Sequence, residues 1–336
     1  MTVVVTGASG WFGRAFLDLL SRTSPEEVHA VVHRPQEVPL VLASLPSARV
    51  HVADVTRPDE IAQVFAGLDA YDVVHAAAVI HPGRSSEFER VNVSGTAGVL
   101  HAALAGGLRR FVHLSSNSAI GTNPTSHEAF RDQEPYDPYL GYGVSKMRGE
   151  VLVTEGLQRA KVPGIILRPP WFYGRFQPER QARFLKTVRT SRFPVVGDGT
   201  NRRSMIDVDR LAHAAHLALR AGTTGVRPYW VADARPYAMN EILAAAREAA
   251  RQEGLPVTGR DLHVPEALGE CAYRIDRTLQ RRGRYNQEIH VAGELGRNIA
   301  CDVDGAVRDL GFDPATDLVD GMRRSYRWAL ANGQDV

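Results

Sequence analysis

The feature that most constrains the fold of this chain is a glycine-rich turn close to its first residue. The β-branched run at residues 2–6 leads into the segment TGASGWFG, which holds Gly7, Gly10 and Gly13. In a strand–turn–helix unit, such glycines permit a tight turn, close approach of a pyrophosphate and helix–strand packing. The free amides at the start of the helix then face the anion. The turn therefore predicts a dinucleotide site, although glycines also form ordinary turns.

Strands and helices alternate through the first half of the chain. Apolar and β-branched runs predict strands over residues 2–6, 28–32, 50–53, 72–77, 110–115 and 164–167. Apolar residues at helical spacing predict helices over residues 11–20, 59–66, 86–105 and 139–159. This alternation predicts an α/β fold in which helices cover both faces of a doubly wound parallel sheet of the Rossmann type.

Glycine and proline interrupt the second half of the chain often, at Pro169, Pro170, Gly174, Pro178, Gly197 and Gly199. Helices are expected over residues 208–220, 240–252, 265–282, 303–310 and 318–330. We therefore expect a smaller, mostly helical C-terminal substrate lobe. The dinucleotide-binding domain is expected over residues 1–168 and the lobe over residues 169–336, with parts of residues 200–235 completing the sheet.

The choice between NAD and NADP depends on the residues that follow the second predicted strand. An acidic residue about 20 positions after the glycine turn would bind the ribose hydroxyls of NAD. At that position this chain has His33, followed by Arg34. A positive side chain there suits the 2′-phosphate of NADP, so NADP(H) is favoured over NAD(H). The alternative interpretation is that Arg34 is a solvated residue before Pro35.

Two further segments are candidates for cofactor contacts. Asp54 follows the third predicted strand and is placed to accept a hydrogen bond from the adenine amino group, although a turn or helix-cap role is nearly as well supported. Residues 76–78, all alanine, end the fourth strand. Their small side chains leave room for a cofactor at the sheet edge, or they serve close packing.

The predicted catalytic residues are Ser116, Tyr142 and Lys146. Tyr142 and Lys146 are four residues apart on a predicted helix, so both point into one cleft. A phenol ionises near pH ~10, and a nearby ammonium favours the phenolate. Ser116 follows the fifth strand, where its hydroxyl would hold the substrate oxygen near Tyr142. Each motif alone is common, and the order of all three is much more specific.

The chain resembles the extended short-chain dehydrogenases, also called the NAD-dependent epimerase/dehydratase family. The resemblance rests on TGASGWFG at 6–13, Asp54, HAAA at 75–78, NVSGT at 92–96, HLSS at 113–116, Gly121, YGVSK at 142–146, LRPPWFYG at 167–174, GDGTNRRSMIDVDR at 197–210 and DVDGAVRDLGFDP at 302–314. It implies the Ser–Tyr–Lys triad above. With the residues already discussed, the candidate cofactor contacts are Gly7, Gly10, Trp11, Phe12, Gly13, His33, Arg34, Asp54, Val55, Ala76, Ala77, Ala78, Asn92, Tyr142, Lys146 and Pro169.

The family performs carbonyl–alcohol redox, sugar epimerisation and sugar dehydration. Asn117 and Ser118 follow Ser116 where nucleotide-sugar dehydratases carry acidic residues, so dehydration is disfavoured. Trp171 stands where epimerases tend to have asparagine, and the C-terminal part resembles 3β-hydroxysteroid dehydrogenases and dihydroflavonol reductases. Arg203 points the other way, because it matches a position that binds diphosphate. Candidate substrate residues are Ser116, Asn117, Trp171, Tyr173 and Arg203.

Three functional hypotheses follow. The first is an NADP-preferring oxidoreductase that moves a hydride between nicotinamide and a secondary alcohol or ketone. The second is a nucleoside-diphosphate-sugar epimerase with tightly bound NAD. The third is a non-catalytic NAD(P)-sensing protein, against which the intact triad argues. By resemblance, a homodimer is expected through the helix at residues 139–159 and its predecessor.

Composition excludes other classes of protein. A formal net charge of +2 is too small to indicate nucleic acid or an anionic membrane as the main partner. No apolar run approaches the ~20 residues that a membrane helix needs. Two distant cysteines, Cys271 and Cys301, predict neither a disulfide framework nor a zinc site and fit a cytoplasmic setting. His213 and His216 lack a third ligand, so no metal site is expected.

Overall fold

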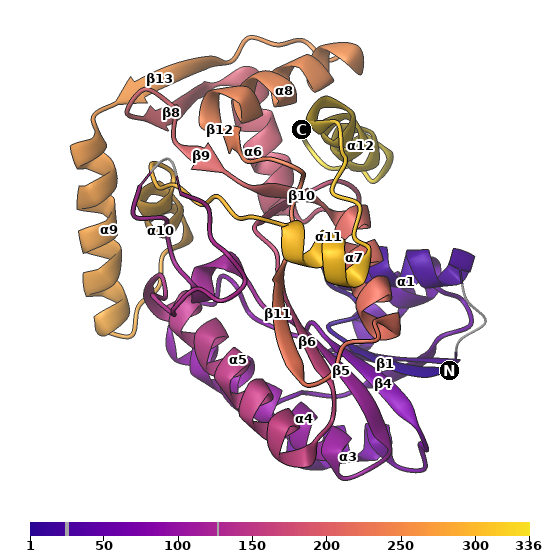
Figure 1. Ribbon diagram of the computed structural model, residues 1–336. Helices are drawn as coiled ribbons and strands as arrows, with labels where there is room; N and C mark the ends of the chain where they lie inside the picture. The colour runs from indigo at the N-terminus through magenta and orange to yellow at the C-terminus, as the bar shows by residue number, and fades with distance from the viewer. Residues whose placement is uncertain (24–26, 126–127) are drawn as a thin grey trace.

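The computed structural model describes residues 1–23, 27–125 and 128–336, and within these a parallel sheet of seven strands forms the base of the molecule (Figure 1). The strand order is β11-β6-β5-β4-β1-β2-β3. The bounds are β1 Thr2–Thr6, β2 Glu27–Val32, β3 Arg49–Val52, β4 Tyr71–His75, β5 Leu108–Leu114, β6 Gly164–Arg168 and β11 Val226–Trp230. Strand order reverses beside β1, where β4 lies on one side and β2 on the other. A doubly wound parallel sheet binds ligands beyond its strand ends at such a point.

Helices cover both faces of this sheet because its strands are apolar on both sides. Within β1, Val3 and Val5 pack on one face, and Val4 packs on the other, as the two-residue period of a strand requires. The first face is covered by α1 (Trp11–Thr23), α2 (Val38–Ser44), α7 (Val208–Arg220) and α11 (Asp304–Leu310). The opposite face is covered by α3 (Pro58–Phe65), α4 (Thr96–Leu104) and α5 (Leu140–Ala160).

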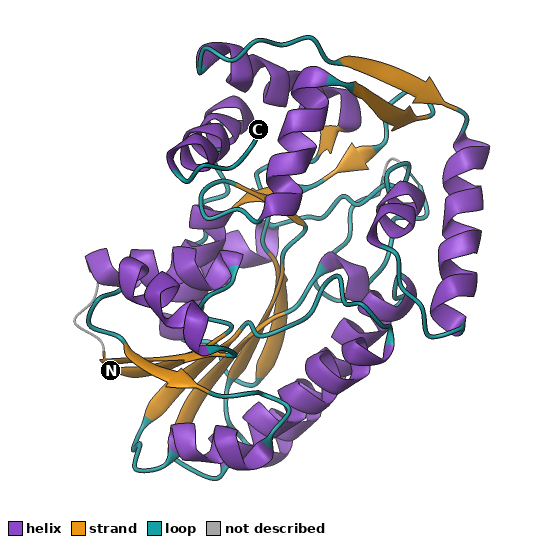
Figure 2. Cartoon of the chain, turned by 180° about the vertical axis from the view of Figure 1, so that it is seen from behind, coloured by secondary structure: helices purple, strands orange, loops and turns teal. Residues whose placement is uncertain are grey.

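A smaller lobe lies beyond the carboxyl ends of the strands (Figure 2). Its core is formed by α6 (Glu179–Thr190), α8 (Met239–Gln252) and α12 (Leu318–Ala331). Short paired strands border it: β7 (Trp171–Tyr173) with β10 (Met205–Asp207), β8 (Arg192–Val196) with β13 (Arg260–Val264), and β9 (Arg202–Arg203) with β12 (Tyr237–Ala238). Two more helices, α9 (Glu266–Arg281) and α10 (Gln287–Glu294), stand beside the start of α5.

The doubly wound sheet with a smaller C-terminal lobe is confirmed, and several elements differ from expectation. The helix expected over residues 86–105 is divided into a π-helical segment, Phe88–Gly95, and α4. Helices α2, α6 and α10 and the short strands of the lobe were not expected. The lobe strands lack the apolar, β-branched runs of the sheet strands: most have two or three residues, Pro194 interrupts β8, and β13 begins with Arg260 and Asp261. The α6 helix did carry a signal, because Ala182, Leu185 and Val188 recur every three residues and are all buried.

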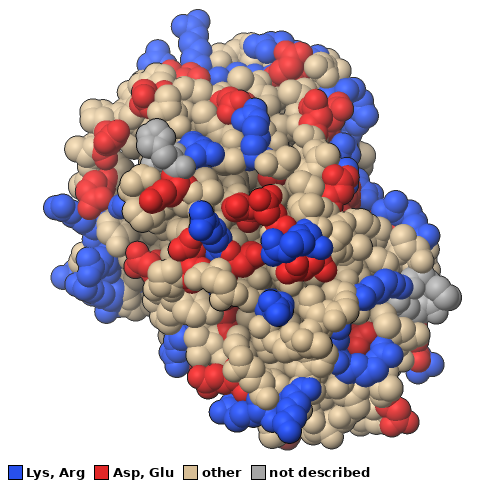
Figure 3. All heavy atoms as spheres, viewed as in Figure 1, with Lys and Arg blue, Asp and Glu red and all other residues tan. Residues whose placement is uncertain are grey.

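Figure 3 shows the surface of the molecule from the same side as Figure 1. Positive and negative side chains are interspersed over this face. Among the described residues, no helix combines the length and apolar character needed to cross a bilayer.

Candidate active site

The glycine turn after β1 has the backbone geometry of a phosphate cradle. Gly7 adopts a φ of +68°, and a Cβ there would lie 2.7 Å from the backbone nitrogen of Ala77. A Cβ at Gly13 would lie 2.3 Å from the carbonyl oxygen of Gly7. At Gly10, by contrast, a Cβ would meet a single described atom within 4 Å, the Gly7 oxygen at 3.2 Å. Gly10 therefore borders open space at the start of α1, where a pyrophosphate fits.

Two aromatic residues of the turn have different surroundings. The Phe12 side chain is buried and stacks on Phe16 at 5.6 Å, so the side chain is not available to a cofactor. Trp11 instead reaches the lobe: its Nε1 donates to the Arg175 carbonyl at 2.6 Å, and its ring meets Phe172 edge-on at 5.6 Å. The turn is thereby attached to the segment that leads into the substrate lobe.

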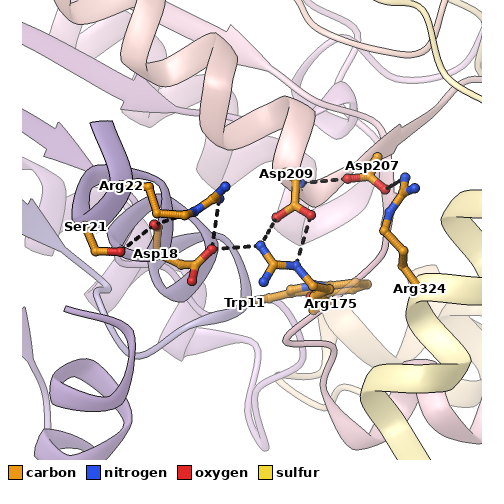
Figure 4. A network of polar contacts seen from close by, with 8 residues as sticks. All are labelled: Trp11, Asp18, Ser21, Arg22, Arg175, Asp207, Asp209 and Arg324. Atoms are coloured by element: carbon orange, nitrogen blue, oxygen red, sulfur yellow. Dashed lines mark hydrogen bonds and ion pairs between the residues drawn. The ribbon is translucent and has the colours of Figure 1, made fainter. Parts of the chain in front are cut away.

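An ionic network reinforces this attachment (Figure 4). The Arg175 guanidinium lies 2.8 Å from Asp18 of α1 and 2.8 Å from Asp209 of α7. Two residues before Asp209, Asp207 pairs with Arg324 of α12 at 2.6 Å. Sheet-covering helices and a lobe helix are therefore held together next to the glycine turn.

The segment after β2 contains a carboxylate that sequence reasoning missed. His33 and Arg34 follow β2, and both side chains are exposed. Glu37 folds back toward the turn, and its Oε2 accepts hydrogen bonds from Ser9 Oγ at 2.9 Å and from the His33 amide at 3.0 Å. The signal was a carboxylate four residues beyond the expected position, displaced by a short 3₁₀ turn at Pro35–Glu37.

Asp54 forms a turn, which is one of the two roles the sequence left open. Its Oδ1 accepts hydrogen bonds from the amide and the hydroxyl of Thr56, at 2.9 and 2.8 Å. Burial raises the pKa of Asp54, but these bonds and the nearby His33 and Arg90 lower it, and the net shift is downward. The following residue, Val55, packs against Gly95.

A buried asparagine binds the segment that follows β4. Asn92 accepts from the Val79 amide at 2.8 Å and donates to the Val79 carbonyl at 2.9 Å and to Ser145 at 2.9 Å. These bonds occupy the Asn92 amide and fix the strand that leads out of the sheet. Residues 76–78 remain partly exposed beside the glycine turn, so the surface there is shallow.

Ser116, Tyr142 and Lys146 come together at the carboxyl end of the sheet. Ser116 and Tyr142 line one cavity, and Lys146 lies one helical turn along α5. Lys146 Nζ donates to the Leu114 carbonyl at 2.7 Å. Burial lowers the pKa of Lys146 to about 8, opposed by Glu150. Burial raises the pKa of Tyr142 to about 12, although a hydrogen bond with Ser116 lowers it.

Buried polar contacts of Glu150 hold the segments that carry Ser116, Tyr142 and Lys146. Glu150 of α5 accepts from Ser115 at 2.5 Å and pairs with Arg168 of β6 at 2.6 Å. Both members of this pair are almost completely buried, so each requires the other. The pair joins α5 to the ends of β5 and β6, and it fixes the segment that carries Ser116.

The cavity above Tyr142 has a volume of about 510 Å³. Aromatic and proline side chains form much of its wall: Pro169, Pro170, Trp171, Phe172, Phe184, Phe193 and Pro194. Asn117 and Arg203 also line it. Arg203 is buried, donates to the Glu294 carbonyl at 2.9 Å and lies 3.6 Å from the Glu294 carboxylate. Its charge is therefore already compensated within the protein.

Tyr173 was expected beside the substrate, and the structure places it elsewhere. Its side chain is fully buried in the lobe core, and its hydroxyl donates to Asp233 at 2.7 Å. The ring packs so closely against Gly321 of α12 that a Cβ there would lie 2.1 Å from it. Packing of β7 under α12 thus uses Tyr173 as a core residue, while Trp171 of the same strand reaches the cavity.

The far wall of the cavity contains titratable residues that sequence reasoning did not identify. His290 of α10 lines the cavity, and its Nδ1 lies 2.7 Å from the fully buried Asp276 of α9. Tyr285 contacts the His290 ring and hydrogen-bonds to His81 at 2.6 Å. Burial, with the charge of Arg180 and the proximity of His290, lowers the pKa of His81 to about 3. These residues come from four separate segments, so no local motif connects them.

Comparison with known proteins agrees with this geometry. Residues 3–232 match the NAD dependent epimerase/dehydratase family. The uncharacterized protein y4nL of Sinorhizobium fredii (strain NBRC 101917 / NGR234) is 36% identical, over 99% of this chain and 96% of its own length. The 2-alkyl-3-oxoalkanoate reductase of Stenotrophomonas maltophilia (strain K279a) is 27% identical, over 96% of this chain and 98% of its own.

Solved structures of enzymes share the whole fold. The UDP-glucuronic acid 4-epimerase from Bacillus cereus in complex with NAD superposes with a TM-score of 0.77 at 20% sequence identity, covering 99% of each chain. The family match covers more than half of this chain. This protein therefore belongs to the NAD dependent epimerase/dehydratase family.

Proposed function

We propose that this protein is an NAD(P)-dependent oxidoreductase that interconverts a secondary alcohol and a ketone, with Tyr142 as the proton donor and acceptor. One observation carries the proposal: Ser116 and Tyr142 line a cavity at the carboxyl end of the sheet, and Lys146 is buried beside them. A nicotinamide held above the glycine turn would supply or accept the hydride. Gly7, Gly10, Gly13 and the amides of Trp11 and Phe12 would hold its pyrophosphate.

Each side chain has a separate task in this proposal. Ser116 holds the substrate oxygen within reach of Tyr142. During ketone reduction, the Tyr142 hydroxyl gives its proton to that oxygen, and burial keeps the phenol protonated until that step. The Lys146 ammonium stabilises the phenolate that results, because opposite charges attract strongly in a buried site. During alcohol oxidation the same groups act in reverse.

The wall of the cavity supports a largely apolar ketone. Its proline and aromatic side chains provide a surface against which an apolar group can pack. Asn117 and Ser118, which line the cavity after Ser116, provide no carboxylic acid for dehydration. Two relatives carry names that fit this chemistry: the 2-alkyl-3-oxoalkanoate reductase above and a farnesyl-dihydroquinoline-oxide ketoreductase of Stigmatella aurantiaca, 27% identical.

Cofactor choice depends on two charged side chains after β2. Arg34 is exposed and favours the 2′-phosphate of NADP(H), as the sequence predicts. Glu37 is bonded to Ser9 of the glycine turn, where it favours ribose hydroxyls and repels a phosphate. The epimerase from Bacillus cereus was solved with NAD. We therefore propose NAD(H) as the preferred cofactor, with Arg34 opposing that preference.

A nucleoside-diphosphate-sugar epimerase with bound NAD is the second candidate. Arg203 favours it, because this residue lines the cavity at the position expected to bind diphosphate. However, the Arg203 guanidinium is already bound to Glu294, and Trp171 lies within 6.0 Å of it. A diphosphate would have to displace Glu294, which makes this candidate the weaker one.

Net consumption of cofactor separates the two candidates. Purified protein is supplied with NADH or NADPH and a panel of apolar ketones, and with UDP-glucose in a parallel series. The oxidoreductase proposal expects one reduced cofactor consumed for each ketone reduced, and no such consumption by the Tyr142→Phe variant. Conversion of UDP-glucose to its epimer without net cofactor consumption would instead establish the epimerase.

We also propose a cytoplasmic homodimer joined through α4 and α5. A surface groove between these helices is lined by Leu100, Leu104, Leu152 and Gly156. Val151, which precedes the groove residue Leu152 in α5, has 37% of its surface exposed. Burying such side chains in a partner is favourable. Light scattering that gives the mass of a monomer would contradict the dimer.

A further inference from the structure

Arg180 contributes a charge to the cavity that alcohol–ketone chemistry does not use. It lies in the first turn of α6, is half-buried and lines the cavity together with Tyr142 and His81. Burial lowers the pKa of its guanidinium, whereas the phenols of Tyr142 and Tyr285 raise it. A guanidinium remains protonated at neutral pH even so. The cavity therefore holds a permanent positive charge near the proposed catalytic phenol.

Two other buried arginines in this region are paired with carboxylates. Arg203 lies 3.6 Å from Glu294, and Arg168 lies 2.6 Å from Glu150. In the described part of the chain, no carboxylate oxygen lies within 4.0 Å of the Arg180 guanidinium. A charge withdrawn from water without a partner is unfavourable. An anion bound beside the Arg180 guanidinium would therefore be stabilised.

The other titratable groups near the cavity do not form an ion pair with Arg180. The buried Asp276 accepts hydrogen bonds from Gln280 at 3.0 Å and lies 2.7 Å from His290 Nδ1. Glu288 lines the cavity but is exposed. Since the pKa of His81 is lowered to about 3, its ring is neutral and adds no further cation at pH 7. Arg183 also lines the cavity, but its side chain is exposed to solvent, whereas Arg180 is half-buried.

We propose that Arg180 binds a carboxylate of the substrate, so that the ketones and alcohols of this enzyme are oxo acids and hydroxy acids. This inference rests on the proposed function, because it names the substrate class of the same cavity. A guanidinium binds a carboxylate through two parallel hydrogen bonds, and one unpaired guanidinium matches one negative charge.

The rest of the cavity agrees with such a substrate. Trp171 and Phe184, which meet edge-on at 4.8 Å, form an apolar surface on the same side as α6. An alkyl chain packs against these rings without needing hydrogen bonds. Arg180 also faces the Tyr142 phenol closely enough to lower its pKa, so the carboxylate lies near the reacting carbon. A short oxo acid with an alkyl tail would place its carboxylate at Arg180, its alkyl chain against Trp171 and Phe184, and its ketone at Tyr142.

The test compares an oxo acid with its neutral isostere. The probes are 3-oxohexanoate and 3-oxohexanamide, and kcat/KM is measured from NADH oxidation by the intact protein. We expect wild type to prefer the acid and Arg180→Gln to lose about 10- to 100-fold on the acid, as for a hydrogen bond to a charged group. The same variant changes kcat/KM for the amide less than threefold. Arg192→Gln, which removes an exposed arginine outside the cavity, is the matched control and leaves both values unchanged.

Two outcomes overturn the proposal while the enzyme still reduces ketones. One is equal loss on acid and amide in Arg180→Gln, which would indicate a general disturbance of α6. The other is a preference of wild type for the amide, or for a ketone phosphate monoester over the acid, which would exclude a carboxylate as the recognised anion.

A binding measurement separates this inference from the proposed function. If the enzyme reduces neither probe, the melting temperature of the NAD-loaded protein is measured with hexanoate and with 1-hexanol. Stabilisation by hexanoate alone, abolished in Arg180→Gln and kept in Arg192→Gln, supports the carboxylate site although the oxidoreductase proposal fails. Absence of any difference between the two compounds overturns the carboxylate site as well.

Discussion

The two walls of the reaction crevice are built in opposite ways. The cofactor side is assembled from strand ends and helix starts of one continuous stretch, in which each loop follows its strand directly. The substrate side is assembled from β7, α6 and β9, which lie within residues 171–203, and from α10, which comes much later in the chain at residues 287–294. The first wall repeats features that any dinucleotide requires. The second is specific to this chain, so it determines which molecule is transformed.

The largest expected effect concerns the cofactor wall. Lys146→Met removes the ammonium that stabilises the Tyr142 phenolate, and we expect kcat for ketone reduction at pH 7 to fall about 100-fold or more. Because the pKa of Lys146 is about 8, its charge is present below that pH and lost above it. The wild-type rate of reduction should therefore fall as pH rises through 8. If the rate of Lys146→Met still fell as pH rose through 8, the fall could not be due to Lys146, and its proposed role would be contradicted.

Gly10 tests the same wall with little disturbance of the fold. A Cβ at Gly10 would meet the Gly7 oxygen at 3.2 Å, a tight contact but a milder one than at Gly13, so Gly10→Ala should lower the melting temperature only slightly. The added methyl group blocks the approach of the pyrophosphate, and we expect the Kd for NADH to rise about tenfold. Gly13→Ala is the contrasting variant, because its Cβ would lie 2.3 Å from the Gly7 oxygen and should lower the melting temperature itself. Unchanged NADH affinity in Gly10→Ala would place the cofactor elsewhere.

Trp171 tests the substrate wall. Trp171→Ala removes a large apolar contact from the cavity, so KM for an apolar ketone should rise up to about tenfold. The Kd for NADH, titrated by fluorescence, should stay the same, because the Trp171 side chain contacts Phe184 and Gln181 of α6. Equal changes in KM and in NADH affinity would show that the two walls are not independent.

The smallest expected effect concerns cofactor preference. Glu37→Ala removes a carboxylate from the proposed ribose site, and relief of about 1 kcal/mol of repulsion shifts the NADPH-to-NADH ratio of kcat/KM roughly fivefold toward NADPH. Arg34→Ala should shift the ratio in the opposite direction. If wild type already prefers NADPH strongly, then Arg34 outweighs Glu37 and the sequence prediction is correct.

The contrast between the walls also explains how far the sequence alone could lead. The sheet, its order of strands and helices, and the convergence of Ser116 with Tyr142 follow from local patterns, because each depends on residues near one another in the chain. Glu37 was missed although it lies close to the predicted position, since a short 3₁₀ turn displaced it.

The substrate wall could not be predicted in the same way. Arg180 and His290 belong to helices whose burial depends on contacts with distant segments, and their sequences contain no chemical motif. Tyr173 shows the converse error: a residue beside Trp171 in the sequence belongs to the lobe core, because α12 packs against it. Proximity along the chain does not decide which side chains reach a cavity formed by several segments.

A single-turnover measurement tests the central claim, that Tyr142 donates the proton in a crevice shared by cofactor and ketone. Protein loaded with NADH is mixed rapidly with a ketone that wild type reduces, and loss of NADH fluorescence is followed. Tyr139→Phe, which removes a nearby buried hydroxyl outside the cavity lining, is the control. We predict that Tyr142→Phe binds NADH as tightly as wild type but oxidises it at least about 100-fold more slowly, while Tyr139→Phe matches wild type. Oxidation by Tyr142→Phe at the wild-type rate would contradict the account.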